Sequence, residues 1–221
     1  DGRKMLISTL PVSFLMQPGN DGAVQAKGDP DAIDFAALFA KQDPMNLRLL
    51  TALRMNATFP YVLPNVWLPT EPKIDVMDAG LRDNYGLETS LRFIHVFNDW
   101  IKENTSGVVL LQIRDRRGGG WEFPFESKDI SEVVTKPLRL LQYNWYKMQQ
   151  FNQLEQLSLT ADLLGNRFKK LTFQYIPAKE DSQAALNFHL TKQEKRDIEQ
   201  ALDNEFNKTG YREFKRIESA E

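Results

Sequence analysis

The alternation of apolar and polar positions along the chain predicts a mixture of strands and helices. Residues 108–114 are almost continuously apolar, which is typical of a buried strand. Shorter apolar runs predict strands over 5–15, 73–77 and 170–176, and a proline near the middle of the first one is expected to split or bulge it. Residues 86–103 carry apolar side chains every three or four positions, which predicts a helix.

Three further helices are predicted from spacing and capping signals. Asp43 and Pro44 resemble the N-cap and first residue of a helix over 45–56. Its predicted apolar face consists of Leu47, Leu50, Ala52 and Leu53. Residues 130–165 predict one long helix or two short ones, and a Thr-x-x-Glu capping box opens a helix over 191–206. The last dozen residues are strongly charged and are expected to fray.

Loops rich in turn-forming residues separate these elements, and the long helix carries a group of aromatic residues. Residues 17–32, 59–70 and 115–127 are rich in turn formers, and the last of them contains Gly118-Gly119-Gly120, which predicts a surface loop. Aromatic residues gather in the long helix at Tyr143, Trp145, Tyr146 and Phe151. We expect them to lie in the core, because aromatic side chains contribute most to core energetics.

The order of elements indicates the fold class. Residues 73–114 predict a strand, a helix and a second strand, which is the βαβ unit of a parallel sheet. We therefore expect an α/β protein with a mainly parallel sheet flanked by helices.

The composition of the chain excludes several kinds of site and partner. The 221 residues carry a net charge of −2, which gives no overall electrostatic footprint for nucleic acid, so no nucleic-acid partner is expected. There is no cysteine, and there are only two histidines, His95 and His189. Disulfides, thiolate metal sites and cysteine nucleophiles are excluded, and we expect no metal and no cofactor. His95 lies beside the predicted apolar face of its helix and is expected to be partly buried.

No apolar stretch is long enough for a transmembrane helix, so we expect a soluble or peripheral protein.

The strongest candidate for chemistry is Asp78, directly after the predicted strand 73–77. Open α/β sheets place ligands and catalytic groups at the carboxyl ends of their strands. Ala79 and Gly80 leave room for another chain segment to approach the carboxylate. From this pattern alone, a turn or helix cap is the more common role of such an aspartate.

Two neighbouring segments resemble patatin-like phospholipases. The first is Leu50-Thr-Ala-Leu-Arg-Met-Asn-Ala-Thr-Phe-Pro-Tyr-Val-Leu-Pro64, and the second is Asp78-Ala79-Gly80-Leu-Arg-Asp-Asn84. In that family, a small-residue helix ending in Phe-Pro precedes a strand that delivers a D-G/A-G motif. The resemblance is specific over residues 44–86 and looser over 1–43 and 187–203, whereas residues 115–180 match no known pattern.

The resemblance implies the second half of a patatin-like fold, organised as a catalytic-aspartate segment over 1–114 and a helix-rich part over 115–221. Asp78 would be the general base of a Ser–Asp dyad that cleaves acyl esters of lipids. Ala79 and Gly80 would form the tight turn, and Asn84, with Arg82, would orient it.

The nucleophile of the family is not recognisable here. It lies in a G-x-S-x-G turn, and none of the nine serines has glycine two residues before it. We therefore expect the chain to be a piece of a longer protein and inactive alone. The missing N-terminal half of the same protein, an acyl-ester substrate and another copy of the chain are the expected partners. The alternative is a non-catalytic binding or assembly module that keeps the scaffold.

Overall fold

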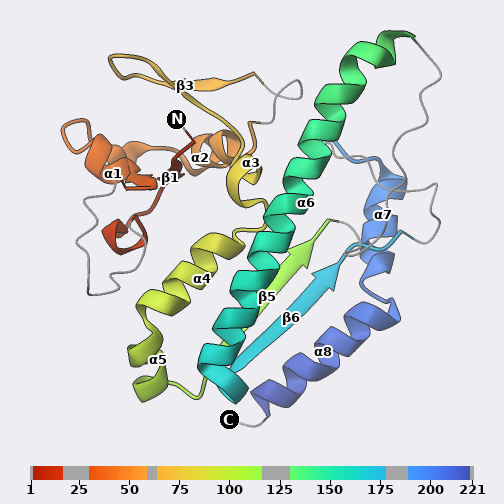
Figure 1. Ribbon diagram of the computed structural model, residues 1–221. Coiled ribbons are helices and arrows are strands. Elements are labelled where there is room, and N and C mark those ends of the chain that lie inside the picture. Colours follow the sequence, from red (N-terminus) through yellow and green to blue (C-terminus); the bar gives the residue numbers. More distant parts are fainter. Residues whose placement is uncertain (1, 17–29, 59–63, 116–129, 178–188, 220–221) are drawn as a thin grey trace.

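The computed structural model describes residues 2–16, 30–58, 64–115, 130–177 and 189–219, with the backbone alone over 130–143. It is a mixed α/β structure in which small parallel sheets are flanked by helices (Figure 1). Most of the predicted turn at 17–32 and the three glycines at 118–120 lie outside the described residues.

The first half of the chain forms short elements. The strands are β1 (Lys4–Leu6), β2 (Ala32–Asp34), β3 (Val66–Leu68) and β4 (Ile74–Val76), and the helices are α1 (Phe35–Leu38), α2 (Leu49–Asn56) and α3 (Gly80–Asp83). Single 3₁₀ turns, η1 (Ser13–Leu15) and η2 (Pro44–Asn46), connect some of them. The predicted first strand thus ends before Pro11, which cannot donate a ladder hydrogen bond.

The second half forms longer elements. These are α4 (Leu87–Val96), α5 (Asn98–Asn104), β5 (Val108–Arg114), α6 (Ile130–Leu164), η3 (Gly165–Arg167), β6 (Phe168–Gln174), α7 (Lys192–Ala201) and α8 (Glu205–Glu218). The predicted long helix is therefore one continuous α6, and the capping box of Thr191 and Glu194 opens α7 as expected.

Strand pairing differs from the prediction within residues 73–114. β4 pairs antiparallel with β3, while β5 pairs in parallel with β6, so the predicted βαβ pairing of 73–77 with 108–114 is wrong. A hairpin to β3 needs only the short connection after Leu68, whereas a parallel pair needs a long crossover. The parallel pairs are β1 with β2 and β5 with β6.

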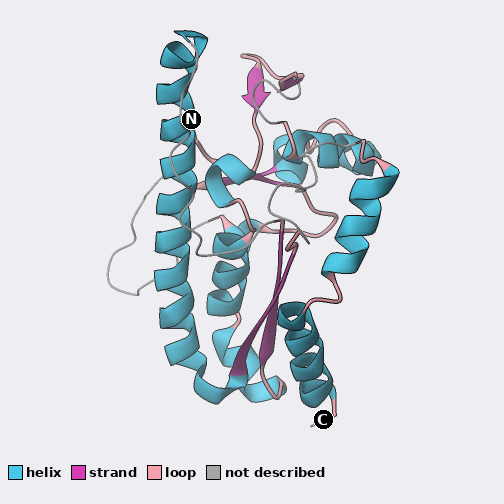
Figure 2. Ribbon diagram, turned by 90° about the vertical axis from the view of Figure 1, so that its right-hand side faces the viewer, coloured by secondary structure: helices cyan, strands magenta, loops and turns pink. Residues whose placement is uncertain are grey.

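The larger core lies on one face of the β5–β6 sheet. Its buried members are Leu87, Leu91, Ile94, Ile101 and Leu164, from α4, α5 and α6. Val108 and Leu110 of β5 pack against this cluster, so the alternate residues of β5 face α4 and α6. α8 covers the other face of the sheet, which makes three layers (Figure 2).

A smaller core holds the first half together, and ion pairs connect it to α4. The small core consists of Phe35, Phe39, Met55 and Leu68. Arg92 of α4 donates to both oxygens of Asp31 at 2.7 Å, and Lys4 of β1 donates to Glu88 of α4 at 3.0 Å. Arg92 holds the pKa of Asp31 below its usual value, mainly through this hydrogen bond.

Several local predictions are wrong because tertiary packing overrides them. The predicted apolar face of the 45–56 helix is only partly correct: Leu47 packs against the small core, but Leu50 and Leu53 are 78% and 56% exposed. Met55 is the buried residue of α2. His95 is exposed on α4, and Trp145 and Phe151 are exposed on α6. The charged C-terminal residues form α8 and do not fray as predicted. Among the described residues, no helix combines the length and apolar character needed to cross a membrane.

Candidate functional site

Asp78 follows β4 directly, and its backbone is fixed to the end of α2. The amide of Asp78 donates to the carbonyl of Thr58 at 3.0 Å, and the amide of Ala79 donates to the carbonyl of Asn56 at 3.1 Å. Thr58 is fully buried, and its hydroxyl donates to the carbonyl of Arg54. The turn after β4 is therefore held in place by the last turn of α2.

The Asp78 carboxylate has two different oxygen environments. Oδ1 accepts a hydrogen bond from the amide of Gly80 at 2.7 Å, at the start of α3. This bond closes the turn after β4, whereas the N-cap residue of α3 is Ala79 and makes no side-chain capping bond. Oδ2 makes no hydrogen bond within the described residues. Burial raises the pKa of Asp78 above its usual value, and the hydrogen bond from Gly80 opposes that rise.

Gly80 is the residue that permits this crowding. A Cβ at position 80 would lie 2.8 Å from Oδ1 of Asp78 and 2.7 Å from Oδ1 of Asn84. The space that the small residue Gly80 leaves is therefore occupied by the side chains of Asp78 and Asn84. Asn84 is exposed, and Ala79 is exposed beside it.

Asp78 lies on the wall of a large open cavity of about 2240 Å³. Residues of β1 and β4 line it, and so do Val108, Leu110 and Ile113 of β5. Within the described residues, β5 pairs with β6 alone, which leaves its other edge unpaired (Figure 1). Small-molecule pockets usually measure about 300–1,000 Å³, so this space has room for a chain segment as well as a ligand.

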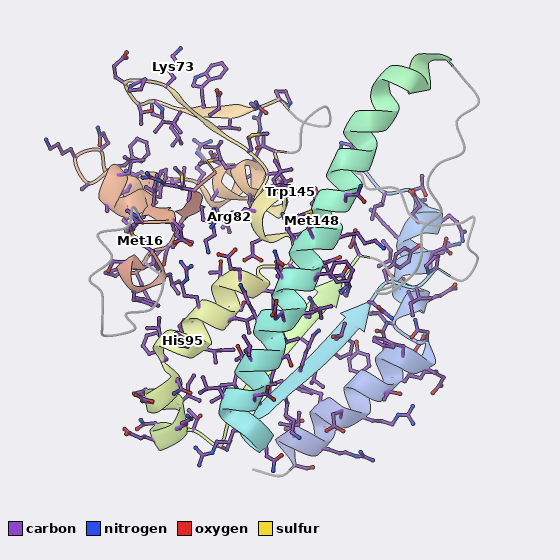
Figure 3. All side chains as sticks on the ribbon, in the orientation of Figure 1. Met16, Lys73, Arg82, His95, Trp145 and Met148 are labelled. Atoms are coloured by element: carbon purple, nitrogen blue, oxygen red, sulfur yellow. The ribbon has the colours of Figure 1, made fainter. Side chains whose placement is uncertain are left out.

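Three side chains of α6 hold the short helix α3, which follows Asp78. Trp145 projects from α6 toward α3, and its ring N–H donates to the carbonyl of Leu81 at 2.6 Å (Figure 3). Gln149 also donates to that carbonyl, and Gln153 donates to Asp83 at 2.9 Å. These donors are four residues apart, so they lie on one face of α6.

Asp83 connects α3, α4 and α6, and its role was not predicted from the sequence. Its carboxylate is buried and accepts from the amides of Glu88 and Thr89 in the first turn of α4. It also accepts from the hydroxyl of Thr89 and from Gln153. An aspartate shortly before an apolar-periodic helix is an N-terminal signal, and that signal could have found the contacts of Asp83 to α4 but not its contact to Gln153 on α6.

Arg82 does not contact the Asp78 carboxylate. Its guanidinium donates to the carbonyl of Gly2 at 2.6 Å and to Asp31 at 3.4 Å, so it fastens α3 to the residues just before β1 and β2 (Figure 3). Any effect of Arg82 on Asp78 therefore passes through the backbone of α3.

The described residues contain no serine hydrogen-bonded to Asp78. Ser90 is the one described serine on the cavity wall, and its hydroxyl donates to the carbonyl of Gly86 at 2.7 Å. His95 and His189 do not line the cavity. Among the described side chains, no three histidines or carboxylates gather in a way that would hold a metal ion.

No family model, curated protein or solved structure matches this chain.

Proposed function

We propose that this chain is the base-bearing part of a patatin-like lipid acyl hydrolase, with Asp78 as the general base. The observation that carries the proposal is the position of Asp78: its carboxylate follows a strand, lies on a cavity wall and keeps Oδ2 free of hydrogen bonds from the described residues. The resemblance of residues 44–86 to that family supplies the reaction class.

The electrostatics of Asp78 support this role. A general base works best when its pKa approaches the working pH, and burial raises the pKa of Asp78 in that direction. Perturbed carboxylates beside clefts are enriched at functional sites, although structural networks also produce them.

The chemistry needs a serine that lies outside these 221 residues. Oδ2 of Asp78 would take the proton of that serine as its oxygen attacks the ester carbonyl. The tetrahedral intermediate would then collapse, and the alcohol would leave with the proton from Asp78. Water, activated by the same carboxylate, would release the fatty acid from the acyl-serine.

The unpaired edge of β5 is where we place the remaining part of the hydrolase. β-strands presenting free amide and carbonyl groups readily accept another strand. A strand added to β5 would lie near the cavity that both β5 and Asp78 line. This arrangement would bring a nucleophile within reach of the base.

Substitution in the parent protein tests the proposal. Asp78→Asn keeps the shape of the side chain and an oxygen for the Gly80 amide, but it removes the base. Hydrolysis of a p-nitrophenyl ester is expected to fall by about 10²–10⁴-fold. Asp75→Asn, on exposed β4 three residues earlier, is the matched control and is expected to keep the wild-type rate.

The second candidate is a non-catalytic binding or assembly module. It is favoured by one observation, namely that Oδ1 of Asp78 already serves the turn into α3. Equal rates for wild type and Asp78→Asn would select this candidate over the hydrolase.

A further inference from the structure

The turn that carries Asp78 is held by two different parts of the molecule. The amides of Asp78 and Ala79 donate to carbonyls at the end of α2, so the backbone of Asp78 is fixed on that side. The helix α3 that follows has only four residues, Gly80–Asp83. A helix of one turn has little stability of its own, so neighbouring elements decide where it lies.

The long helix α6 fixes α3 on the other side. The ring N–H of Trp145 and the side-chain amide of Gln149 both donate to the carbonyl of Leu81. This carbonyl lies near the C-terminal end of α3, where carbonyl groups have no amide of the same helix to bind. Side chains of α6 therefore satisfy this end of α3.

The contact between Gln153 and Asp83 is the most enclosed of this set. Both side chains are buried, with 6% and 9% of their surface exposed, and Gln153 donates to Oδ1 of Asp83 at 2.9 Å. The same carboxylate accepts from the amides of Glu88 and Thr89 in the first turn of α4. Because α4 packs against α6 in the larger core, Asp83 is held by two elements that support each other.

One hydrogen bond spans the junction between the part held by α2 and the part held by α6. Oδ1 of Asp78 accepts from the amide of Gly80, the first residue of α3, at 2.7 Å. The place of α3 therefore sets the orientation of the Asp78 carboxylate. Because the two oxygens of a carboxylate are rigidly joined, the bond to Oδ1 also sets the direction of Oδ2.

We propose that Gln153 and Trp145 of α6 are positioning residues, which orient the Asp78 carboxylate through α3 for proton transfer. This inference rests on the proposed function of Asp78 as a general base. A base must lie within about 2.6–3.2 Å of the atom whose proton it takes, and a displacement of about 1 Å can lower a rate about 10²-fold. Gln153 does not line the cavity, so its effect on the reaction passes through α3.

Hydrogen exchange of the 221-residue chain tests whether α6 holds α3, and it does not depend on catalysis. Gln153→Met keeps the length of the side chain and removes its donor. Amide exchange at Gly80 and Asp83 is expected to accelerate about tenfold, while exchange in α8 stays at its wild-type rate. Gln156→Met makes the same change at an exposed position of α6 and is expected to exchange as wild type does.

A milder variant keeps this test free of folding defects. Trp145→Phe keeps an aromatic ring and removes the N–H that donates to Leu81. Faster exchange at Gly80 is expected here too, whereas Trp100→Phe, at an exposed position of α5, is expected to leave it unchanged. Wild-type exchange at Gly80 in both Gln153→Met and Trp145→Phe would overturn the proposal.

Kinetics of the parent protein separate positioning from stability. Rates with a p-nitrophenyl ester are compared well below the melting temperature of every variant. Gln153→Met is expected to lower kcat about tenfold and to leave KM unchanged, because it disturbs the geometry of the base and no binding contact. In an Asp78→Asn background the same substitution is expected to cause no further loss, because no base remains to be oriented.

The outcomes distinguish a failure of this inference from a failure of the proposed function. An equal loss of kcat from Gln153→Met in both backgrounds would overturn the positioning role, because the loss would then not pass through Asp78. A wild-type rate for Asp78→Asn alone would reject the general base, and with it the catalytic purpose of these contacts. Wild-type exchange at Gly80 in the α6 variants would reject the positioning residues alone.

Discussion

At the scale of single residues, Asp78 combines a structural and a chemical property. Its Oδ1 accepts from Gly80 and starts α3, while Oδ2 remains without a partner in the described structure. The sequence suggested both roles as competing alternatives, since an aspartate at a strand end suits a turn as well as a base. The hydrogen bond to Oδ1 is the turn contact, and the role of Oδ2 as a base is our proposal.

The raised pKa of Asp78 predicts a stability effect with a defined sign. In the unfolded chain Asp78 ionises near pH 3.8, whereas in the folded chain it ionises at higher pH. Stability therefore falls as pH rises through the window from 3.8 to the folded pKa, because the native state holds the proton more tightly there.

Asp78→Asn removes this penalty. The melting temperature of the variant is expected to equal or exceed that of wild type at neutral pH, and the difference is expected to vanish in acid, where Asp78 is protonated in both states. Melting followed by circular dichroism at several pH values measures this. A variant markedly less stable than wild type at neutral pH would contradict a raised pKa.

At the scale of elements, apolar runs and capping residues within a segment correctly predicted the strand or helix that the segment forms. The apolar run 108–114 matches β5 in both bounds, and the Thr191–Glu194 capping box marks the start of α7. The pairing of β4 was missed because its partner β3 lies within residues 59–70, whose turn formers predicted a loop. The exposed face of α2 was missed because tertiary packing decides which side of a short helix is buried. The Asp78 turn was predicted, but its contacts to Thr58 and its support from α6 were not.

The helix α8 shows why the prediction of a frayed C-terminus was wrong. Tyr211 packs on Phe173 of β6 with ring centroids 4.7 Å apart. Asn204 caps its first turn by accepting from the amide of Asn207. High charge alone therefore does not indicate fraying when one face of the segment is apolar.

Asn207 of α8 is expected to be a main stabilising contact of this layer. It is 1% exposed, its oxygen accepts from the amide of Gln174, and its Nδ2 donates to the carbonyls of Gln174 and Ala201. Asn207→Ala leaves these groups without partners and is expected to cost about 3 kcal/mol, measured by urea unfolding. Asn166→Ala, at an exposed position of η3, is the control and is expected to change stability by less than about 0.5 kcal/mol. A similar small change in Asn207→Ala would refute this role.

At the scale of the whole molecule, β5 has an unpaired edge among the described residues, and α8 covers its face of the β5–β6 sheet only in part. Leu111 and Ile113 of β5 are 53% and 74% exposed on the face that α8 covers only in part. Leu49 and Leu50 of α2 add a second exposed apolar area. Such surfaces favour association with another chain or segment.

The isolated 221-residue chain is therefore expected to self-associate. Light scattering after size exclusion measures its mass, and Ile113→Lys is expected to shift the population toward monomer by placing a charge on the exposed strand. Lys169→Met, also exposed but on β6, leaves Ile113 intact and is expected not to disperse the assembly. A monodisperse wild-type monomer would contradict the expectation.

The most direct measurement of the central claim is the pH dependence of acyl-enzyme formation in the parent protein. The pre-steady-state burst with a p-nitrophenyl ester reports the step in which Asp78 would accept the serine proton. For wild type, the burst rate is expected to rise through an apparent pKa above 3.8, the usual value for an aspartate. For Asp78→Asn, the burst is expected to slow by about 10²–10⁴-fold and to lose that rise. An Asp78→Asn burst with the wild-type rate and pH dependence would contradict the assignment of Asp78 as the base.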